Sequence, residues 1–212
     1  MRRIWIVAVT AALALSLAAC KSSGGKVQGG PTPAGASTAA ASPTPAPTVA
    51  TPAGTGKAAP TTLDPCKLFT QSEASKLTGV TLGTVKTSSE NGLKVCVYQK
   101  PGRSLTVQVA QAASVAQAQS EKDKLIAEAK SELNSQFPQF HPKLSTLSDL
   151  GDAAENLTAS GSAQGITLQT NALYVLQGTV GFDLVDLSIN GGNVCKLPAL
   201  KDAANTVLSR LP

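Results

Sequence analysis

Histidine is nearly absent from this sequence, which contains His141 and no second one. A zinc site built on two or three imidazoles is therefore excluded, and a serine-histidine-aspartate triad would have to use this single residue. The short patterns that mark α/β-hydrolases, P-loop nucleotidases and zinc metalloproteases do not occur either. Because His141 stands alone between Phe140 and Pro142, an ordinary surface role is the better interpretation. We expect the protein to be no enzyme and to hold neither a metal nor a cofactor; a hydrolase that uses His141 is the alternative.

Aromatic residues and unbalanced charge are also scarce. Aromatic side chains make up 3% of the chain, and its formal net charge is +5. Residues 63–212 contain thirteen basic and thirteen acidic side chains, so the whole excess lies before them. Binding of nucleic acid needs a basic surface, and binding of single strands also needs aromatic side chains for stacking. Nucleic acid is therefore not an expected partner.

A long apolar run occurs at residues 4–17, directly after Arg2 and Arg3. Such a run is too short to cross a bilayer comfortably, which takes about 20 residues, but it suits the central region of a signal peptide. It ends in Leu-Ala-Ala-Cys at Cys20, which resembles the lipobox of bacterial lipoproteins, whose cysteine accepts a diacylglycerol. The resemblance implies that residues 1–19 are a removable signal peptide and that Cys20 anchors the chain to a membrane. Two acyl chains are what stable membrane attachment requires.

Residues 20–62 consist almost entirely of glycine, serine, threonine, alanine and proline. They hold too little apolar surface to offset the entropy that is lost on ordering. We interpret them as a disordered tether, with a stiffer polyproline II stretch at residues 43–48, that lifts a domain off the membrane. A docking motif or an O-glycosylated segment at the same prolines and threonines is the alternative.

Residues 63–212 are long enough to form one domain with a hydrophobic core. Thr70 and Glu73 make a capping box, in which each side chain bonds the backbone amide of the other, and this predicts a short helix. Ser114 and Gln117 begin a second helix of about 23 residues, whose apolar side chains recur along one stripe. These helices enclose the first group of predicted strands.

Six stretches have the residue alternation of a strand, and they fall into two groups of three. They cover residues 81–87, 93–99, 104–110, 154–159, 166–177 and 179–189. A final helix is predicted at residues 198–211, because proline suits a first helical turn. The order helix, three strands, helix, three strands, helix predicts an α+β domain, with an antiparallel sheet of about six strands packed by helices.

The last predicted strand contains two acidic residues and a shift in its apolar phase. The shift predicts a bulge near Leu184, since a bulge inserts one extra residue without ending the strand. Asp183 and Asp186 would face opposite ways on a regular strand, and the bulge could bring them together. We interpret both as solvated acids on the faces of the strand.

Three short segments of residues 63–212 resemble an actinobacterial family of small lipoproteins of unknown function. They are Asp64-Pro65-Cys66-Lys67-Leu68-Phe69-Thr70, Cys96-Val97-Tyr98 and Leu150-Gly151-Asp152-Ala153-Ala154. Domains of this family typically open with Asp-Pro-Cys-x-Leu-x-Thr and carry a later cysteine that an aromatic residue follows two positions on. More distantly, the chain is similar to the extracellular sensor domains of mycobacterial receptor kinases. The resemblance implies a cell-envelope protein that binds or senses, and it carries over no catalytic residue.

Three thiols remain once Cys20 is acylated, so at least one of them lacks a partner within the chain. The family pattern favours a disulfide between Cys66 and Cys96, and a disulfide between Cys66 and Cys195 is the alternative. A catalytic role for the Cys195 thiol is not favoured, because no histidine lies near it in the sequence to activate it.

The sequence thus predicts a monomeric, lipid-anchored protein on the outer face of the cell membrane. Its domain is expected to bind an envelope ligand or partner without catalysis, in an apolar crevice between sheet and helices or on a loop surface. An envelope hydrolase that uses His141 and a purely structural lipoprotein are the two alternatives.

Overall fold

The structure, a computed structural model, describes residues 62–90, 92–136, 138–163 and 165–212. The predicted signal peptide, Cys20 and all but the last residue of the predicted tether lie outside these residues. None of the described helices is both long and apolar enough to cross a membrane.

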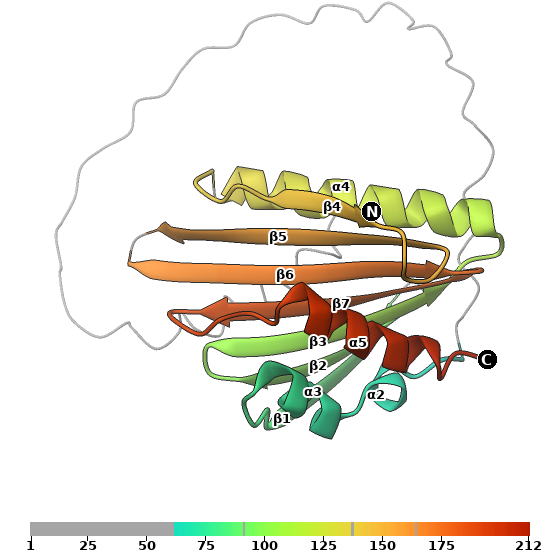
Figure 1. Cartoon of the computed structure of the whole chain (residues 1–212), viewed down its shortest axis with the longest axis horizontal. Coiled ribbons are helices and arrows are strands. Elements are labelled where there is room, and N and C mark those ends of the chain that lie inside the picture. Colours follow the sequence, from blue (N-terminus) through green and yellow to red (C-terminus); the bar gives the residue numbers. More distant parts are fainter. Residues whose placement is uncertain (1–61, 91, 137, 164) are drawn as a thin grey trace, which may run out of the picture. The chain divides into compact units, whose positions relative to one another are not determined.

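Four helices form within the described residues, and local side chains explain where they begin and end (Figure 1). They are α2 (Pro65–Leu68), α3 (Gln71–Thr78), α4 (Val115–Gln136) and α5 (Leu197–Leu208). Before α3, the Thr70 hydroxyl accepts from the Glu73 amide and the Glu73 carboxylate accepts from the Thr70 amide, which confirms the capping box. Gly79 ends this helix with a φ of 69°, a left-handed conformation that glycine adopts without strain.

Seven strands form one antiparallel sheet, which confirms the predicted α+β class. They are β1 (Thr84–Glu90), β2 (Leu93–Lys100), β3 (Arg103–Gln111), β4 (Lys143–Leu147), β5 (Ala153–Ala163), β6 (Ile166–Gln177) and β7 (Val180–Ile189). Their spatial order is β1-β2-β3-β7-β6-β5-β4, so two meanders meet where β3 pairs with β7. Helix α4 carries the chain from the inner strand β3 to the outer strand β4 (Figure 1).

Two details of the predicted sheet are wrong. The sheet has a seventh strand, β4, which the sequence pattern does not reveal because most of its residues are exposed at the sheet edge and show no apolar alternation. The bulge predicted near Leu184 does not form, since β7 pairs residue by residue with both neighbours from Val180 to Ile189. The apolar phase shifts instead because β7 lies inside the sheet and is buried on both faces.

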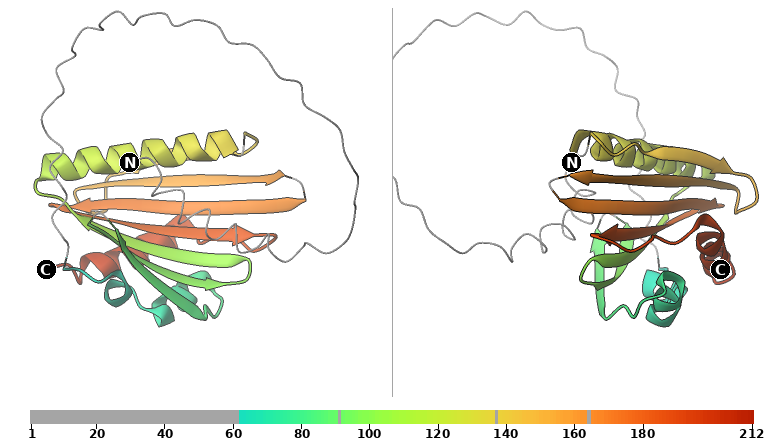
Figure 2. Two further views of the ribbon diagram at one scale, coloured as in Figure 1. Left: turned by 180° about the vertical axis from the view of Figure 1, so that it is seen from behind. Right: turned by 60° about the vertical axis from the view of Figure 1, so that its left-hand side comes forward.

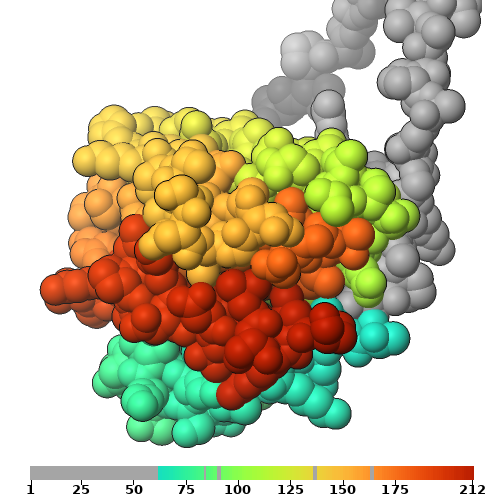
Figure 3. All heavy atoms as spheres, turned by 45° about the vertical axis from the view of Figure 1, so that its right-hand side comes forward, coloured from blue at the N-terminus to red at the C-terminus, as the bar shows by residue number. Residues whose placement is uncertain are grey.

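Helices cover both faces of the sheet. Helices α2, α3 and α5 pack on one face, here called the α5 face, and α4 packs on the other, the α4 face (Figures 1 and 2). Seen as solid spheres, α5 lies between the teal N-terminal helices and the yellow and orange β4–β5 part of the chain (Figure 3). A sheet with two covered faces explains why its inner strands are apolar without regular alternation.

The larger core lies on the α5 face. Its strand side chains include Leu105, Val107, Val109, Leu173, Val175, Phe182 and Leu184, and its α5 side chains are Leu200, Ala203, Ala204 and Val207. The core on the α4 face is smaller, with Ile126 of α4 packed against Leu157, Ala172 and Tyr174. Buried apolar area is the main stabilising contribution to a fold, so the α5 face holds most of it.

Candidate functional site

A disulfide fixes the first helix to the sheet on the α5 face. Cys66 of α2 and Cys96 of β2 form the bond, with their Cα atoms 5.4 Å apart. This is the pairing that the family resemblance favours, and the alternative pairing of Cys66 with Cys195 is wrong. Cys195 keeps a free thiol and is buried in the segment that joins β7 to α5.

A buried ion pair lies beside Cys195. Nη2 of Arg103, the first residue of β3, is 2.7 Å from Oδ2 of Asp186 on β7, and the two side chains are 7% and 0% exposed. The same Asp186 oxygen accepts from the Cys195 amide at 2.6 Å. Nη1 of Arg103 donates to the Asn193 carbonyl at 2.6 Å. The pair therefore pins the β7–α5 loop to the sheet at two points.

Two asparagines extend this polar cluster across the sheet. Asn171 of β6 donates to the Cys195 carbonyl at 2.7 Å. Its own side-chain oxygen accepts from Asn156 of β5 at 2.5 Å, and Asn156 also donates to the Ala172 carbonyl. Buried polar groups are stable only when they are paired, so the cluster fixes one position for the loop.

The Cys195 thiol is held in its protonated form. It donates to the Leu77 carbonyl at 3.3 Å, and burial together with the nearby Asp186 raises its pKa to about 12. A reactive cysteine needs a thiolate near neutral pH, so these surroundings give Cys195 a packing role.

A hollow of about 370 Å³ opens next to the ion pair, and we call it the Arg103 hollow. Its lining comes from the end of α3, the β2–β3 turn and the β7–α5 loop. The lining residues are Thr78, Val80, Lys100, Pro101, Gly102, Arg103, Ser188, Ile189, Asn190, Gly191, Gly192 and Asn193. They include two cations and no carboxylate, and because Arg103 is paired with Asp186 beneath the lining, Lys100 supplies the net positive charge of this surface.

Two polar atoms at the base of the Arg103 hollow have no partner. Nε of Arg103 and Oγ of Ser188 are buried, and neither makes a hydrogen bond within the described residues. Gly192 lies directly over Ser188, because a Cβ at this position would be 2.9 Å from Ser188 Oγ and 3.9 Å from Nη1 of Arg103. Only a glycine fits there, both for space and because its φ is 135°.

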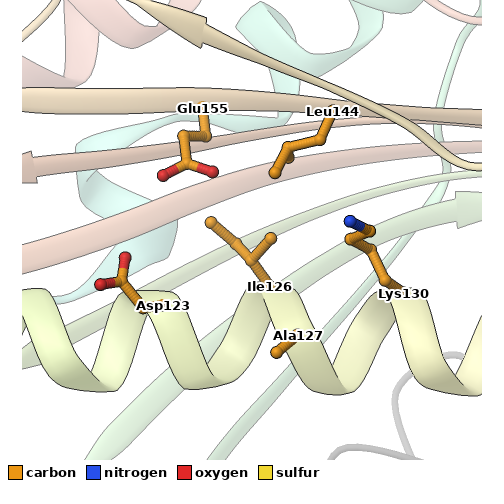
Figure 4. Close-up of a pocket in the computed structure, with 6 residues that line it drawn as sticks. All are labelled: Asp123, Ile126, Ala127, Lys130, Leu144 and Glu155. Carbon is orange, nitrogen blue, oxygen red and sulfur yellow. The ribbon is translucent and has the colours of Figure 1, made fainter.

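A second hollow, here called the α4 groove, lies between α4 and strands β4 and β5. Its volume is about 260 Å³, and its lining residues are Asp123, Ile126, Ala127, Lys130, Leu144 and Glu155. Ile126 rises from α4 toward Leu144, with Asp123 on one side and Lys130 on the other (Figure 4). Leu144 is 39% exposed, so an apolar side chain of this lining is open to solvent. It is the feature nearest to the crevice predicted between sheet and helices.

The two acids of β7 are not solvated as predicted. Both are buried, and they point to opposite faces: Asp186 to the α5 face and Asp183 to the α4 face. Asp183 lies opposite Gln108 of β3 and Tyr174 of β6. Burial raises the pKa of Asp183 to about 8, so it is largely protonated at neutral pH.

His141 is exposed in the segment between α4 and β4, and it lines neither hollow. Within the part of the chain that the structure describes, no three or more histidine, cysteine, aspartate or glutamate side chains gather closely enough to hold a metal ion.

Sequence reasoning missed the residues of the Arg103 hollow. Arg103 follows a Pro-Gly turn and looks like a solvated strand end, and its partner Asp186 is far away in the sequence. The consecutive glycines Gly191 and Gly192 were the one local signal, since such pairs mark a backbone that approaches another group closely.

The fold and the site define an α+β domain with a hollow that Lys100 and Arg103 line. The chain belongs to the family described as "Protein of unknown function (DUF3558)", whose model matches residues 15–148. This confirms the resemblance to a family of unknown function, and the family description assigns no activity.

One solved structure with some likeness is the "Crystal structure of LpqN involved in cell envelope biogenesis of Mycobacterium tuberculosis". The two sequences are 16% identical, and the likeness covers 60% of this chain and 81% of the LpqN chain with a TM-score of 0.29. A score of this size does not establish a common fold. No curated protein sequence matches this chain.

Proposed function

We propose that this chain is a lipid-anchored protein of the outer face of the cell membrane, and that its domain binds a ligand without changing it chemically. The apolar run at residues 4–17 and the lipobox-like ending at Cys20 support export and anchoring. The disulfide between Cys66 and Cys96 supports the same location, because such bonds persist in oxidising compartments.

The Arg103 hollow is the observation that carries the binding role. Its volume of about 370 Å³ lies in the range of small-molecule sites, about 300–1,000 Å³. The guanidinium of Arg103 and the hydroxyl of Ser188 line it, and each has a buried polar atom without a partner within the described residues, which calls for an explanation. The polar cluster holds the Asn193 and Cys195 carbonyls beside the hollow through Arg103 and Asn171.

Anchoring is tested by metabolic labelling with an alkyne fatty acid in the native host. We expect the wild-type chain to carry the label and to sediment with membranes, and Cys20→Ser to lose both properties. A wild-type chain that stays in the cytosol, with Met1 in place and no added acyl mass, would contradict the proposal.

Binding is tested on the mature chain, isolated from membranes in detergent and measured by native mass spectrometry. We expect a bound mass on the wild-type chain. Pro101→Trp places a large side chain at the exposed rim of the Arg103 hollow and should remove that mass. Ala127→Trp, the matched change in the α4 groove, should keep it.

Each other outcome argues against a part of the proposal. A bound mass that survives Pro101→Trp but not Ala127→Trp moves the site to the α4 groove. A wild-type chain with no bound mass after isolation from envelope extracts supports a purely structural lipoprotein. Loss of a cleavage activity in His141→Ala would support the envelope hydrolase, for which the described residues offer no partner of His141.

A further inference from the structure

We infer that the ligand of the Arg103 hollow carries an oxyanion, a phosphate or a carboxylate group, which the Arg103 guanidinium and the Ser188 hydroxyl bind. This inference rests on the proposed function, because it names the chemistry of the same site. Lys100 on the rim adds a second positive charge, and no lining residue opposes it with a negative one.

The guanidinium of Arg103 is only partly used by the protein. It has five N–H donors. Nη2 bonds Asp186 at 2.7 Å and approaches the sulfur of Cys195 at 3.7 Å, and Nη1 bonds the Asn193 carbonyl. Nε is left without a partner within the described residues. The guanidinium is therefore held by the fold through Nη1 and Nη2, and it keeps one buried N–H, at Nε, without a partner within the described residues.

The unused donors suit an oxyanion better than a neutral ligand. A buried donor without a partner is unfavourable by about 1–3 kcal/mol, so a group that accepts from it is favoured. Ser188 Oγ lies beneath Gly192 with Nη1 of Arg103 close by, and one phosphate or carboxylate group has two oxygens that can accept from the hydroxyl and from the guanidinium. Charge-assisted hydrogen bonds of this kind are about twice as strong as neutral ones.

The loop above these donors is anchored at both ends and has two glycines between the anchors. It is anchored at Asn190, whose amide donates to the Thr167 carbonyl, and at Asn193, whose carbonyl accepts from Arg103. Between the anchors, the amides of Gly191 and Gly192 make no hydrogen bond within the described residues. Two glycines have no side-chain barrier to a change of φ and ψ. A shift of Gly192 exposes the two donors, and the free amides of the loop can then turn toward the anion.

The α4 groove does not offer the same chemistry. Asp123 and Glu155 line it beside Lys130, and Glu155 is paired with the buried ammonium of Lys122 at 2.6 Å. An anion would meet two carboxylates there. An anionic ligand is therefore favoured at the Arg103 hollow over the α4 groove.

The inference is tested by hydrogen–deuterium exchange of the full mature chain in phosphatidylcholine nanodiscs, at constant ionic strength. The probes are inorganic phosphate and succinate, with chloride as the reference salt. We expect slower, saturable exchange of the amides at residues 188–194 with phosphate or succinate. Nanodiscs that also contain phosphatidylglycerol distinguish the source: protection without added anion identifies a lipid headgroup, and protection only with the soluble probes identifies a free anion.

Matched variants show whether the site is specific. Lys100→Gln removes the rim charge of the Arg103 hollow, and Lys130→Gln makes the same change in the α4 groove. We expect Lys100→Gln to raise the half-saturating anion concentration several-fold. Ser188→Ala should raise it about tenfold, which corresponds to 1.4 kcal/mol of binding free energy. Lys130→Gln should match the wild-type chain, and melting temperatures of all variants report whether they fold.

The outcomes separate this inference from the proposed function. Suppose that Pro101→Trp removes the native bound mass but that phosphate, succinate and phosphatidylglycerol give no protection. The oxyanion inference is then wrong, and the site holds a neutral ligand. Equal responses of Lys100→Gln and Lys130→Gln show general salt binding and also overturn it. A chain with neither a bound mass nor protection contradicts both proposals.

Discussion

Asp186 and Asp183 lie three positions apart on β7, both are buried, and the two faces of the sheet give them different partners. On the α5 face, Asp186 accepts from the Arg103 guanidinium and from the Cys195 amide. On the α4 face, Asp183 makes no ion pair within the described residues, and burial raises its pKa to about 8. Burial raises the pKa of the Asp186 carboxyl as well, but the hydrogen bonds from Cys195 and the charge of Arg103 oppose that rise. The comparison teaches that donors and a counter-charge fixed around a buried carboxylate oppose the protonation that burial favours.

Breaking the ion pair between Arg103 and Asp186 should have the largest effect on stability. Asp186→Ala leaves the Arg103 guanidinium buried without its counter-charge, and we expect the free energy of unfolding to fall by about 3–5 kcal/mol. Urea denaturation measures the loss. The double variant Arg103→Met/Asp186→Leu should recover most of it, because an apolar pair of similar volume has no charge to solvate. A loss below about 1 kcal/mol in Asp186→Ala would show that the pair is not buried in solution.

The covalent bond on the same face should come next in size. Replacing Cys66 and Cys96 by alanine frees a loop of thirty residues, and we expect the unfolding free energy to fall by about 2–4 kcal/mol. Hydrogen exchange should speed up in α2 and α3, while α4 on the other face should keep its rates. Faster exchange in α4 to the same degree would mean that the two faces unfold as one unit.

Asp183→Asn tests the α4 face through pH. In the wild-type chain the native state holds a proton that the unfolded state releases near pH 4, so stability falls as pH rises from about 4 to about 8. Asparagine does not titrate, so the variant should match the wild-type chain near pH 4 and exceed it near pH 8. We expect a gain of about 1 kcal/mol, since the buried amide also needs partners. Thermal melts over this pH range measure it, and parallel curves would contradict a raised pKa.

The smallest effect on stability is expected for the surface ion pair between Arg210 and Glu73. Arg210 and the Thr70 donors lower the pKa of Glu73 to about 2, below the usual value of 4.5. A lowered carboxyl pKa stabilises the fold above the usual value, and this stabilisation is lost as pH falls toward 2. Glu73→Gln should therefore cost less than about 1 kcal/mol at pH 7 and nothing near pH 2. Melting curves at the two pH values check this, with Lys76→Gln on the same helix as the control.

The sequence predicts those parts of the fold that depend on neighbouring residues. Thr70 and Glu73 identify the start of α3 because a capping box is complete within four residues. The strands of both meanders follow from runs of apolar and β-branched residues, with bounds close to those predicted. Strand β4 gives no such signal, since it gains its partners from β5 while its own side chains stay in solvent.

The candidate site depends on contacts that no local pattern contains. Arg103 and Asp186 lie 83 positions apart, and only the pairing of β3 with β7 brings them together. The interpretation of Asp183 and Asp186 as solvated acids failed for the same reason, because their burial is decided by helices that pack over β7. A sequence shows that a residue is acidic, and the register of its neighbours decides whether water reaches it.

The position of the disulfide also has a mechanical consequence. Tension that enters the domain from the residues before Leu63 reaches Cys66 in the first turn of α2. From there the disulfide to Cys96 transmits the force directly into β2. The segment between the two cysteines, which includes α3 and β1, therefore carries none of the force. A domain pulled by its leading end would thus keep these elements slack for as long as the bond stays oxidised.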